Sequence, residues 1–327
     1  MESIQDKLSH QPFLQGMKPE QLAIIARHAR EVEFTKDQVI FRQNEHAHQF
    51  HLIVHGKVVV ESYMGRAENL PLQIITAGDV LGWSWLFPPF TWHFQARALE
   101  PVKSIFIDGA SLLLACEQVH SFGFELMKRM AQVVIVRFES AQRQFFQSEV
   151  SIKIMGLADP LHGDEMEAPS NEQSLLEKLE THPFFKGMKP AHLKVLANAS
   201  MISNFEKGDV IFSEGDPANR FYVIQHGKVV LAAQSTGKPE VKFQIIGAGD
   251  LLGWSWLFAP YYAHFKASAL ESTQSLFLYG TRLREACEED HELGYELMKR
   301  TLKVVIQRLQ ATRQRILDNS NVEANRC

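Results

Sequence analysis

Two Gly-Trp-Ser-Trp segments, Gly82–Trp85 and Gly253–Trp256, carry the residues of this chain best suited to hold a small ligand. Each serine hydroxyl is a hydrogen-bond donor, and each indole offers a flat face on which a base stacks. Cationic side chains follow each segment, namely His93 and Arg97 after the first and His264 and Lys266 after the second. The doubled segment indicates where two equivalent sites are expected to lie.

Both segments belong to a repeat that covers most of the chain. At a constant offset of 171 residues, Ile75–Phe87 matches Ile246–Phe258 at eleven of thirteen positions, and the similarity runs without a gap from about residue 8 to about residue 146. Each copy is therefore about 140 residues long, a usual size for a domain with its own core. The sequence predicts two tandem domains, residues 1–150 and residues 174–327.

Residues 151–173 separate the two copies. They contain four helix-breaking residues, Gly156, Pro160, Gly163 and Pro169, together with several acidic side chains. This composition is typical of a flexible acidic linker.

Seven short runs rich in Val, Ile and Phe predict the strands that position the first segment. They span residues 31–34, 38–41, 50–54, 57–62, 72–75, 93–98 and 102–107. Short strands at this spacing are typical of an antiparallel sandwich or barrel. A helix is expected before them, over residues 20–29 after Pro19, and two helices after them, over residues 110–117 and 123–149.

The long helix of each copy has an apolar stripe. In residues 123–149 it includes Met127, Met130 and Val134 at spacings of three and four residues, and residues 294–317 repeat it. Such a stripe covers either its own barrel or a partner helix. A homodimer through the helices 123–149 and 294–317 is therefore one expectation.

Composition narrows the functional class. Net charge is −4 and 45% of residues are hydrophobic, values that fit a globular protein and disfavour a nucleic-acid surface. No apolar run reaches the length of a membrane span, and the N-terminus does not resemble a signal peptide. The equivalent residues Cys116 and Cys287 predict buried free thiols, so a cytoplasmic location is expected.

Residues 205–229 and 248–253 resemble the cyclic nucleotide-binding domain of catabolite-activator-type regulators and protein kinase A regulatory subunits. The matching features are Phe205-Glu-Lys-Gly-Asp, Glu214-Gly-Asp-Pro-Ala-Asn and Ala248-Gly-Asp-Leu-Leu-Gly253. The resemblance implies two mainly β domains, each a double-stranded β-helix (jelly roll) with an N-terminal helix and two C-terminal helices. In the first copy Asn44 replaces the motif's Gly215, a change that is tolerated because asparagine also enters the left-handed region.

In this family a glutamate of the phosphate-binding cassette accepts the ribose hydroxyl, and an arginine neutralises the cyclic phosphate. The glutamate position is Trp83 or Trp254 in this chain, and the arginine position is Trp92 or Ala263. The candidate ligand-binding residues are Gly82, Trp83, Ser84, Trp85, Trp92, His93 and Arg97 in the first copy and Gly253, Trp254, Ser255, Trp256, His264 and Lys266 in the second.

Three interpretations of these sites stay open. The tryptophans fill a pocket that has lost its ligand, with one ring of each pair in the core and one at the surface. Alternatively, the pocket holds an altered nucleotide-type ligand, or it binds an ordinary cyclic mononucleotide. The difference between Trp92 and Ala263 suggests that the two sites are not equivalent.

Other functions find less support. His46, His48, His51 and His55 resemble the metal ligands of a cupin-like enzyme, yet only His55 recurs in the second copy, as His226. No catalytic residues and no metal site are therefore expected. The few residues after Leu317 do not make a DNA-reading module, so direct DNA binding is not expected either.

The sequence thus favours a non-enzymatic, cytoplasmic sensor or adaptor that acts through protein partners of unknown identity and has no resident cofactor. One alternative is a receptor for cyclic AMP, cyclic GMP or a cyclic dinucleotide in an atypical pocket. A second alternative is a cupin-like metal-dependent enzyme.

Overall fold

The computed structural model describes residues 2–62, 69–147, 174–233, 240–257 and 261–324. It divides into two compact units, Met1–Val133 and Val134–Cys327, each of which contains one barrel. The linker expected at residues 151–173 lies outside the described residues.

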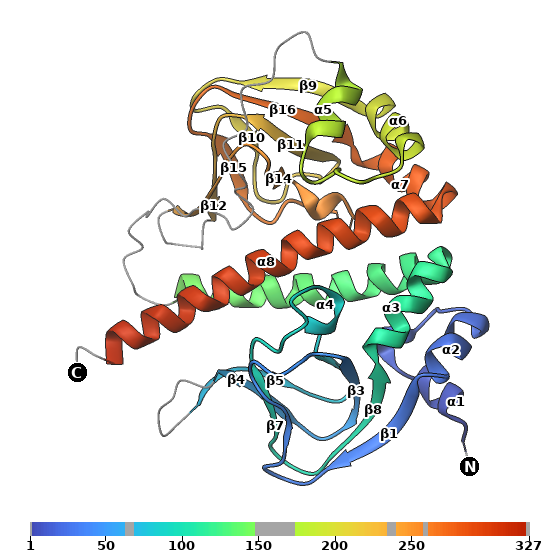
Figure 1. The fold of residues 1–327 in the computed structure, drawn as a ribbon. Helices are drawn as coiled ribbons and strands as arrows, with labels where there is room; N and C mark the ends of the chain where they lie inside the picture. Colours follow the sequence, from blue (N-terminus) through green and yellow to red (C-terminus); the bar gives the residue numbers. More distant parts are fainter. Residues whose placement is uncertain (1, 63–68, 148–173, 234–239, 258–260, 325–327) are drawn as a thin grey trace. The chain divides into compact units, whose positions relative to one another are not determined.

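The described part of the first unit contains eight antiparallel strands in two four-stranded sheets, ordered β1-β8-β3-β6 and β2-β7-β4-β5 (Figure 1). The strands are β1 (Ala29–Phe34), β2 (Val39–Phe41), β3 (Gln49–His55), β4 (Val58–Ser62), β5 (Leu70–Ile75), β6 (Val80–Leu81), β7 (Gln95–Ala98) and β8 (Val102–Asp108). The helices are α1 (Ile4–Ser9), η1 (Pro12–Leu14), α2 (Pro19–Ala26), η2 (Ser84–Leu86), α3 (Gly109–Gln118) and α4 (His120–Gln147), whose last residues belong to the second unit.

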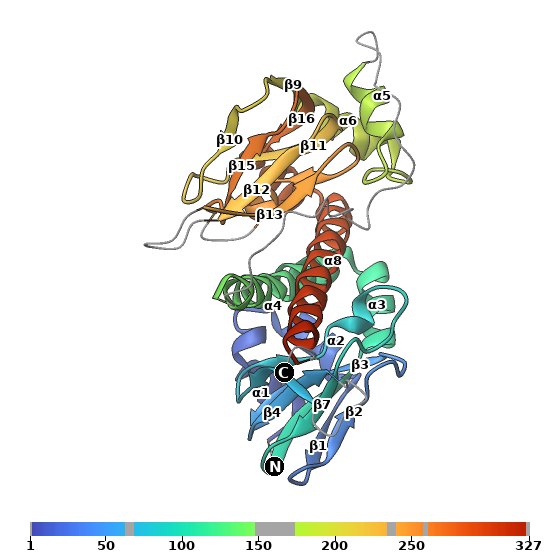
Figure 2. The same ribbon diagram turned by 90° about the vertical axis from the view of Figure 1, so that its left-hand side faces the viewer.

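The second barrel repeats this plan with sheets ordered β14-β11-β16-β9 and β10-β15-β12-β13. Its strands are β9 (Ser200–Phe205), β10 (Val210–Phe212), β11 (Arg220–His226), β12 (Val229–Ala233), β13 (Val241–Ile246), β14 (Leu251–Leu252), β15 (Lys266–Ala269) and β16 (Thr273–Tyr279). Its helices are α5 (Leu175–Thr181), α6 (Pro190–Asn198), η3 (Trp254–Leu257), α7 (Gly280–Glu289) and α8 (His291–Ala324). Figures 1 and 2 show α5 and α6 at one end of this barrel, with α6 in contact with β9.

Local sequence signals explain the helix starts in both copies. Ser3 and Ser174, which are repeat equivalents, each form a capping box with an acidic residue three positions later. Pro19 and Pro190 occupy the first turn of α2 and α6, where the missing amide proton is not needed.

The predicted strands and helices are present, with three differences. Strands β6 and β14 were not predicted, because two residues are too few to show a period of two. Two short extra helices, α1 and η1, precede α2. Helix α8 extends to Ala324, beyond the predicted end at Leu317.

Packing confirms the expected core positions. The stripe residues Met127, Met130 and Val134 are fully buried, and Cys116 and Cys287 are buried free thiols. Asn44 adopts a φ of 68°, close to the 83° of Gly215, which confirms that asparagine serves at this turn. None of the described helices is both long and apolar enough to cross a membrane.

Candidate functional site

Each Gly-Trp-Ser-Trp segment, called the cassette from here on, directly follows a two-residue strand. Gly82 follows β6 and Gly253 follows β14, with φ values of 88° and 78° that an L side chain rarely adopts. The chain then enters the short helices η2 and η3, which contain Ser84 and Ser255. This local geometry is therefore the same in the two copies.

Both tryptophans of each cassette are buried. The exposed fractions are 5% for Trp83, 1% for Trp85, 2% for Trp254 and 0% for Trp256. The expectation of one buried ring and one surface ring is therefore wrong. The cause is that the short helices lie against the core, where Trp85 stacks on Phe50 with ring centroids 5.0 Å apart.

A histidine stacks on the first tryptophan of each pair. The His93 ring lies 6.3 Å from that of Trp83 at an interplanar angle of 16°, and His264 lies 5.9 Å from Trp254 at 22°. Ser84 Oγ also lies 3.4 Å from His93 Nδ1. One face of each of these indoles is thus occupied by an imidazole.

Trp92 fills the first barrel. Its ring stacks on Phe41 at a centroid distance of 3.8 Å and is 3% exposed. It also approaches Gly82 so closely that a Cβ atom there would lie 2.9 Å from the indole. Trp92 belongs to a continuous apolar cluster with Ile53, Val58 and Leu81, so its ring is part of the core of the first barrel.

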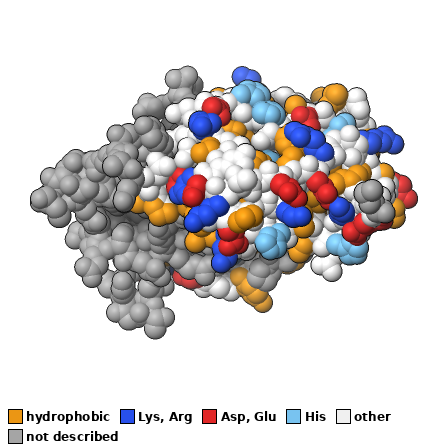
Figure 3. Space-filling view, turned by 90° about the horizontal axis from the view of Figure 1, so that it is seen from below, with side chains coloured by type: hydrophobic (Ala, Val, Ile, Leu, Met, Phe, Trp, Pro, Cys, Tyr) orange, Lys and Arg blue, Asp and Glu red, His pale blue; other side chains and the backbone are white. Residues whose placement is uncertain are grey.

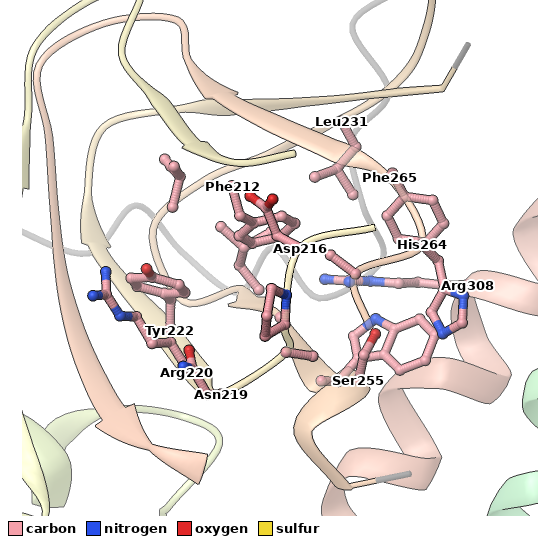
Figure 4. A pocket seen from close by; sticks show the side chains of 17 residues that line it. Phe212, Asp216, Asn219, Arg220, Tyr222, Leu231, Ser255, His264, Phe265 and Arg308 are labelled. Carbon is pink, nitrogen blue, oxygen red and sulfur yellow. The ribbon is translucent and has the colours of Figure 1, made fainter. Parts of the chain in front are cut away.

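The second barrel contains a cavity of about 220 Å³. Ala263, the repeat equivalent of Trp92, lies in its wall. Four predicted residues line the cavity together, namely Gly253, Trp254, Ser255 and His264. Trp256 and Lys266 are not among the described lining residues. Aromatic and aliphatic side chains, including Phe212, Tyr222 and Leu231, complete the wall (Figure 4), a mixture typical of small-molecule sites.

Arg308 is one of the pocket residues that were not predicted from the sequence. It lies on α8, is 3% exposed, and runs from the helix toward the middle of the pocket (Figure 4). Its Nη2 donates a hydrogen bond to the carbonyl oxygen of Leu251 on β14 at 2.8 Å. A signal was present, because the repeat keeps arginine at the equivalent position, Arg137.

The two predicted cations outside the cassettes are held by carboxylates. Arg97 donates to both carboxylate oxygens of Glu61 at 3.1 Å and also pairs with Asp37 at 3.1 Å. Lys266 pairs with Glu240 at 2.9 Å. Burial alone would raise the pKa of Glu61, but the hydrogen bonds from Arg97, Gln95 and Asn69 outweigh it and lower that pKa.

Residues of α4 that belong to the second unit contact the rim of its pocket. The Phe138 ring lies 5.9 Å from that of Trp254, and the carboxylate of Glu139 lies 3.0 Å from His264 Nδ1. His264 is thus held between the cassette tryptophan and an acidic side chain of another helix.

The histidines of residues 46–55 do not form a metal site among the described residues. His51 is buried against Ser104 Oγ at 3.1 Å, whereas His46 and His48 stack on each other. The group of described side chains that is close enough to hold a metal is His192, Asp290 and Glu292. In that group the Lys189 ammonium pairs with Glu292 at 2.6 Å.

Comparison with known proteins identifies the domain type. Residues 31–119 and 202–290 match the profile of the cyclic nucleotide-binding domain. The CRP-like cAMP-activated global transcriptional regulator of Mycobacterium tuberculosis is 25% identical over 134 residues, which are 41% of this chain and 58% of that protein. The chain therefore matches little more than half the length of that relative.

Two solved structures are also similar. A cyclic nucleotide-binding protein from Geobacter metallireducens is 30% identical, with a TM-score of 0.38, and the match covers 41% of this chain and 96% of that one. The regulatory domain of Toxoplasma gondii PKA with cAMP is 12% identical, with a TM-score of 0.32, and covers 89% of this chain and 94% of that one.

Proposed function

Since the chain belongs to the cyclic nucleotide-binding domain family and carries two copies of the domain, we propose that it is a regulatory sensor with one working site. In this proposal the second barrel binds a small nucleotide-type ligand and the first barrel is a filled scaffold. The observation that carries it is the cavity beside Ala263, at the position where Trp92 fills the first barrel.

The volume of the cavity supports the binding of a single small ligand. Its volume of about 220 Å³ is below the roughly 300–1,000 Å³ of drug-sized pockets, which favours a mononucleotide over a cyclic dinucleotide with two bases. The binding mode differs from that of the family, because Trp254 and Ala263 replace the usual glutamate and arginine.

In this proposal the helices that follow each barrel transmit the effect of ligand binding to a protein partner. Helix α8 supports this, because one of its side chains lines the pocket while the helix continues to Ala324. Direct DNA recognition is not part of the proposal. Figure 3 shows acidic and basic side chains intermixed on the face that it presents, unlike the basic stripe of a nucleic-acid surface.

The repeat itself supplies the variants for a test. Isothermal titration calorimetry of the full chain against cyclic AMP, cyclic GMP, cyclic di-GMP, adenosine and guanosine is expected to detect one mononucleotide or nucleoside per chain. Ala263→Trp copies the first barrel and has Phe212 available for stacking, as Phe41 is for Trp92, so it should abolish binding. Trp92→Phe is the matched control and should leave the affinity unchanged.

Two outcomes would contradict the proposal. One is the absence of binding by every compound in the panel. The other is an unchanged affinity of a folded Ala263→Trp variant, which would place the ligand outside the cavity.

A further inference from the structure

Arg308 is the enclosed cation of the second pocket, and it comes from α8 rather than from the cassette. Its side chain is 3% exposed and points from α8 into the cavity (Figure 4). Its Nη2 donates a hydrogen bond to the Leu251 carbonyl oxygen at 2.8 Å. A guanidinium in a water-poor site interacts strongly with an anion, because the local dielectric constant is low.

The other charged groups around the pocket point to different partners. Arg220 lines the side of the pocket opposite Arg308 (Figure 4), and its guanidinium lies 5.5 Å from the centroid of the Phe277 ring. The carboxylate of Asp216 accepts a hydrogen bond from the Ser213 amide at 2.7 Å within an exposed turn. Among the described lining residues, Arg308 is the arginine or lysine that is buried.

We infer that Arg308 pairs with the phosphate of a mononucleotide bound in the second barrel, the role that no side chain of the cassette can fill. This inference rests on the proposed function of that barrel. The planar fork of a guanidinium matches two phosphate oxygens, and Phe212, Tyr222 and Phe265 offer apolar surface for a base. Arg308 belongs to α8 and is hydrogen-bonded to β14. A phosphate bound to its guanidinium would therefore link that helix to the barrel.

The test compares ligands that differ only in the phosphate. Calorimetry of the full chain should show cyclic AMP binding more tightly than adenosine, and cyclic GMP more tightly than guanosine, by about tenfold or more, the effect of one buried charge-assisted contact. Arg308→Gln should remove this preference. Arg137→Gln, the same change in the first copy, is the matched control and should keep the preference.

The possible results distinguish the proposed function of the second barrel from the role of Arg308 in it. No binding of any compound to the unmodified chain would overturn the proposed function itself. Nucleosides that bind the unmodified chain as tightly as the cyclic nucleotides would overturn the role of Arg308 alone, without need of a variant. A preference that persists in Arg308→Gln, with an unchanged circular dichroism spectrum, would overturn it as well.

Discussion

A single pair of equivalent residues makes the two barrels different. Trp92 stacks on Phe41 and touches Gly82, whereas Ala263 leaves the same space open beside Phe212. The cassettes are otherwise alike, with the same Gly-Trp-Ser-Trp sequence and the same stacked histidine. The volume of the side chain at this one position therefore distinguishes the two barrels.

Another single-residue difference should be visible in the pH dependence of stability. His51 occupies the position of Tyr222 and is 1% exposed. Burial, helped by the charges of Arg30 and His48, lowers its pKa to about 3. An unfolded histidine takes up a proton below about pH 6.5, and the folded one does not until about pH 3.

Stability should therefore fall as the pH drops from about 6.5 toward 3, by an amount on the order of 4 kcal/mol from this residue. Urea unfolding of the full chain at pH 7 and pH 5 samples the upper part of this fall, about 2 kcal/mol. His51→Phe should have a clearly shallower pH dependence than the unmodified chain. His182, whose pKa is lowered to about 4 by burial, is present in both proteins and cancels in the comparison. Equal slopes would show that His51 does not contribute.

At the scale of elements, the cassette helix of each copy is pressed against the start of the next helix. A Cβ atom on Gly109, the first residue of α3, would lie 2.7 Å from the Trp85 ring. One on Gly280, the first residue of α7, would lie 2.9 Å from Trp256 Cβ. Glycine at these positions is what lets the cassette and the C-terminal helices pack together.

Substituting these glycines tests that packing. Gly109→Ala and Gly280→Ala should each lower the free energy of unfolding by about 1–3 kcal/mol, the usual effect of overpacking a core. Only Gly280→Ala should also weaken ligand binding, because η3 lines the open pocket. Chemical denaturation and calorimetry measure the two effects, and equal losses of affinity in both variants would contradict the assignment of the ligand to the second barrel.

At the scale of the whole chain, the repeat produces two similar barrels, and the proposal assigns the ligand to the second. The second unit has the cavity, the enclosed Arg308 and the rim contacts of Phe138 and Glu139. The first unit has Trp92 in the barrel and Arg97 held by Glu61.

Hydrogen exchange should report this asymmetry directly. A ligand at about one hundred times its Kd stabilises the state that binds it by about 2.7 kcal/mol. Peptides that cover β10, β11 and η3 should therefore exchange more slowly with saturating ligand, and the equivalent peptides with β2, β3 and η2 should not change. Ala263→Trp is the control and should show no protection. Equal protection of both barrels would indicate two working sites.

Much of the molecule follows from the sequence by itself. The offset of 171 residues, the strand runs and the apolar stripes depend on local order along the chain, and they predicted two tandem domains, each an antiparallel sandwich or barrel. The jelly-roll fold was implied by the resemblance to the cyclic nucleotide-binding domain. Asn44 in the left-handed region and the buried thiols of Cys116 and Cys287 follow from residue type in the same way. The cassettes and four lining residues of the second pocket were also located from the sequence.

Only the tertiary structure decided the chemistry of the pocket. Whether Arg97 and Lys266 face a ligand depends on Glu61 and Glu240, which lie on other strands or turns. Arg308 follows Ala263 by 45 positions along the chain, so its entry into the cavity is set by how α8 packs on the barrel. Residue type and spacing describe local geometry, but the partners of a charge and the filling of a cavity are long-range contacts.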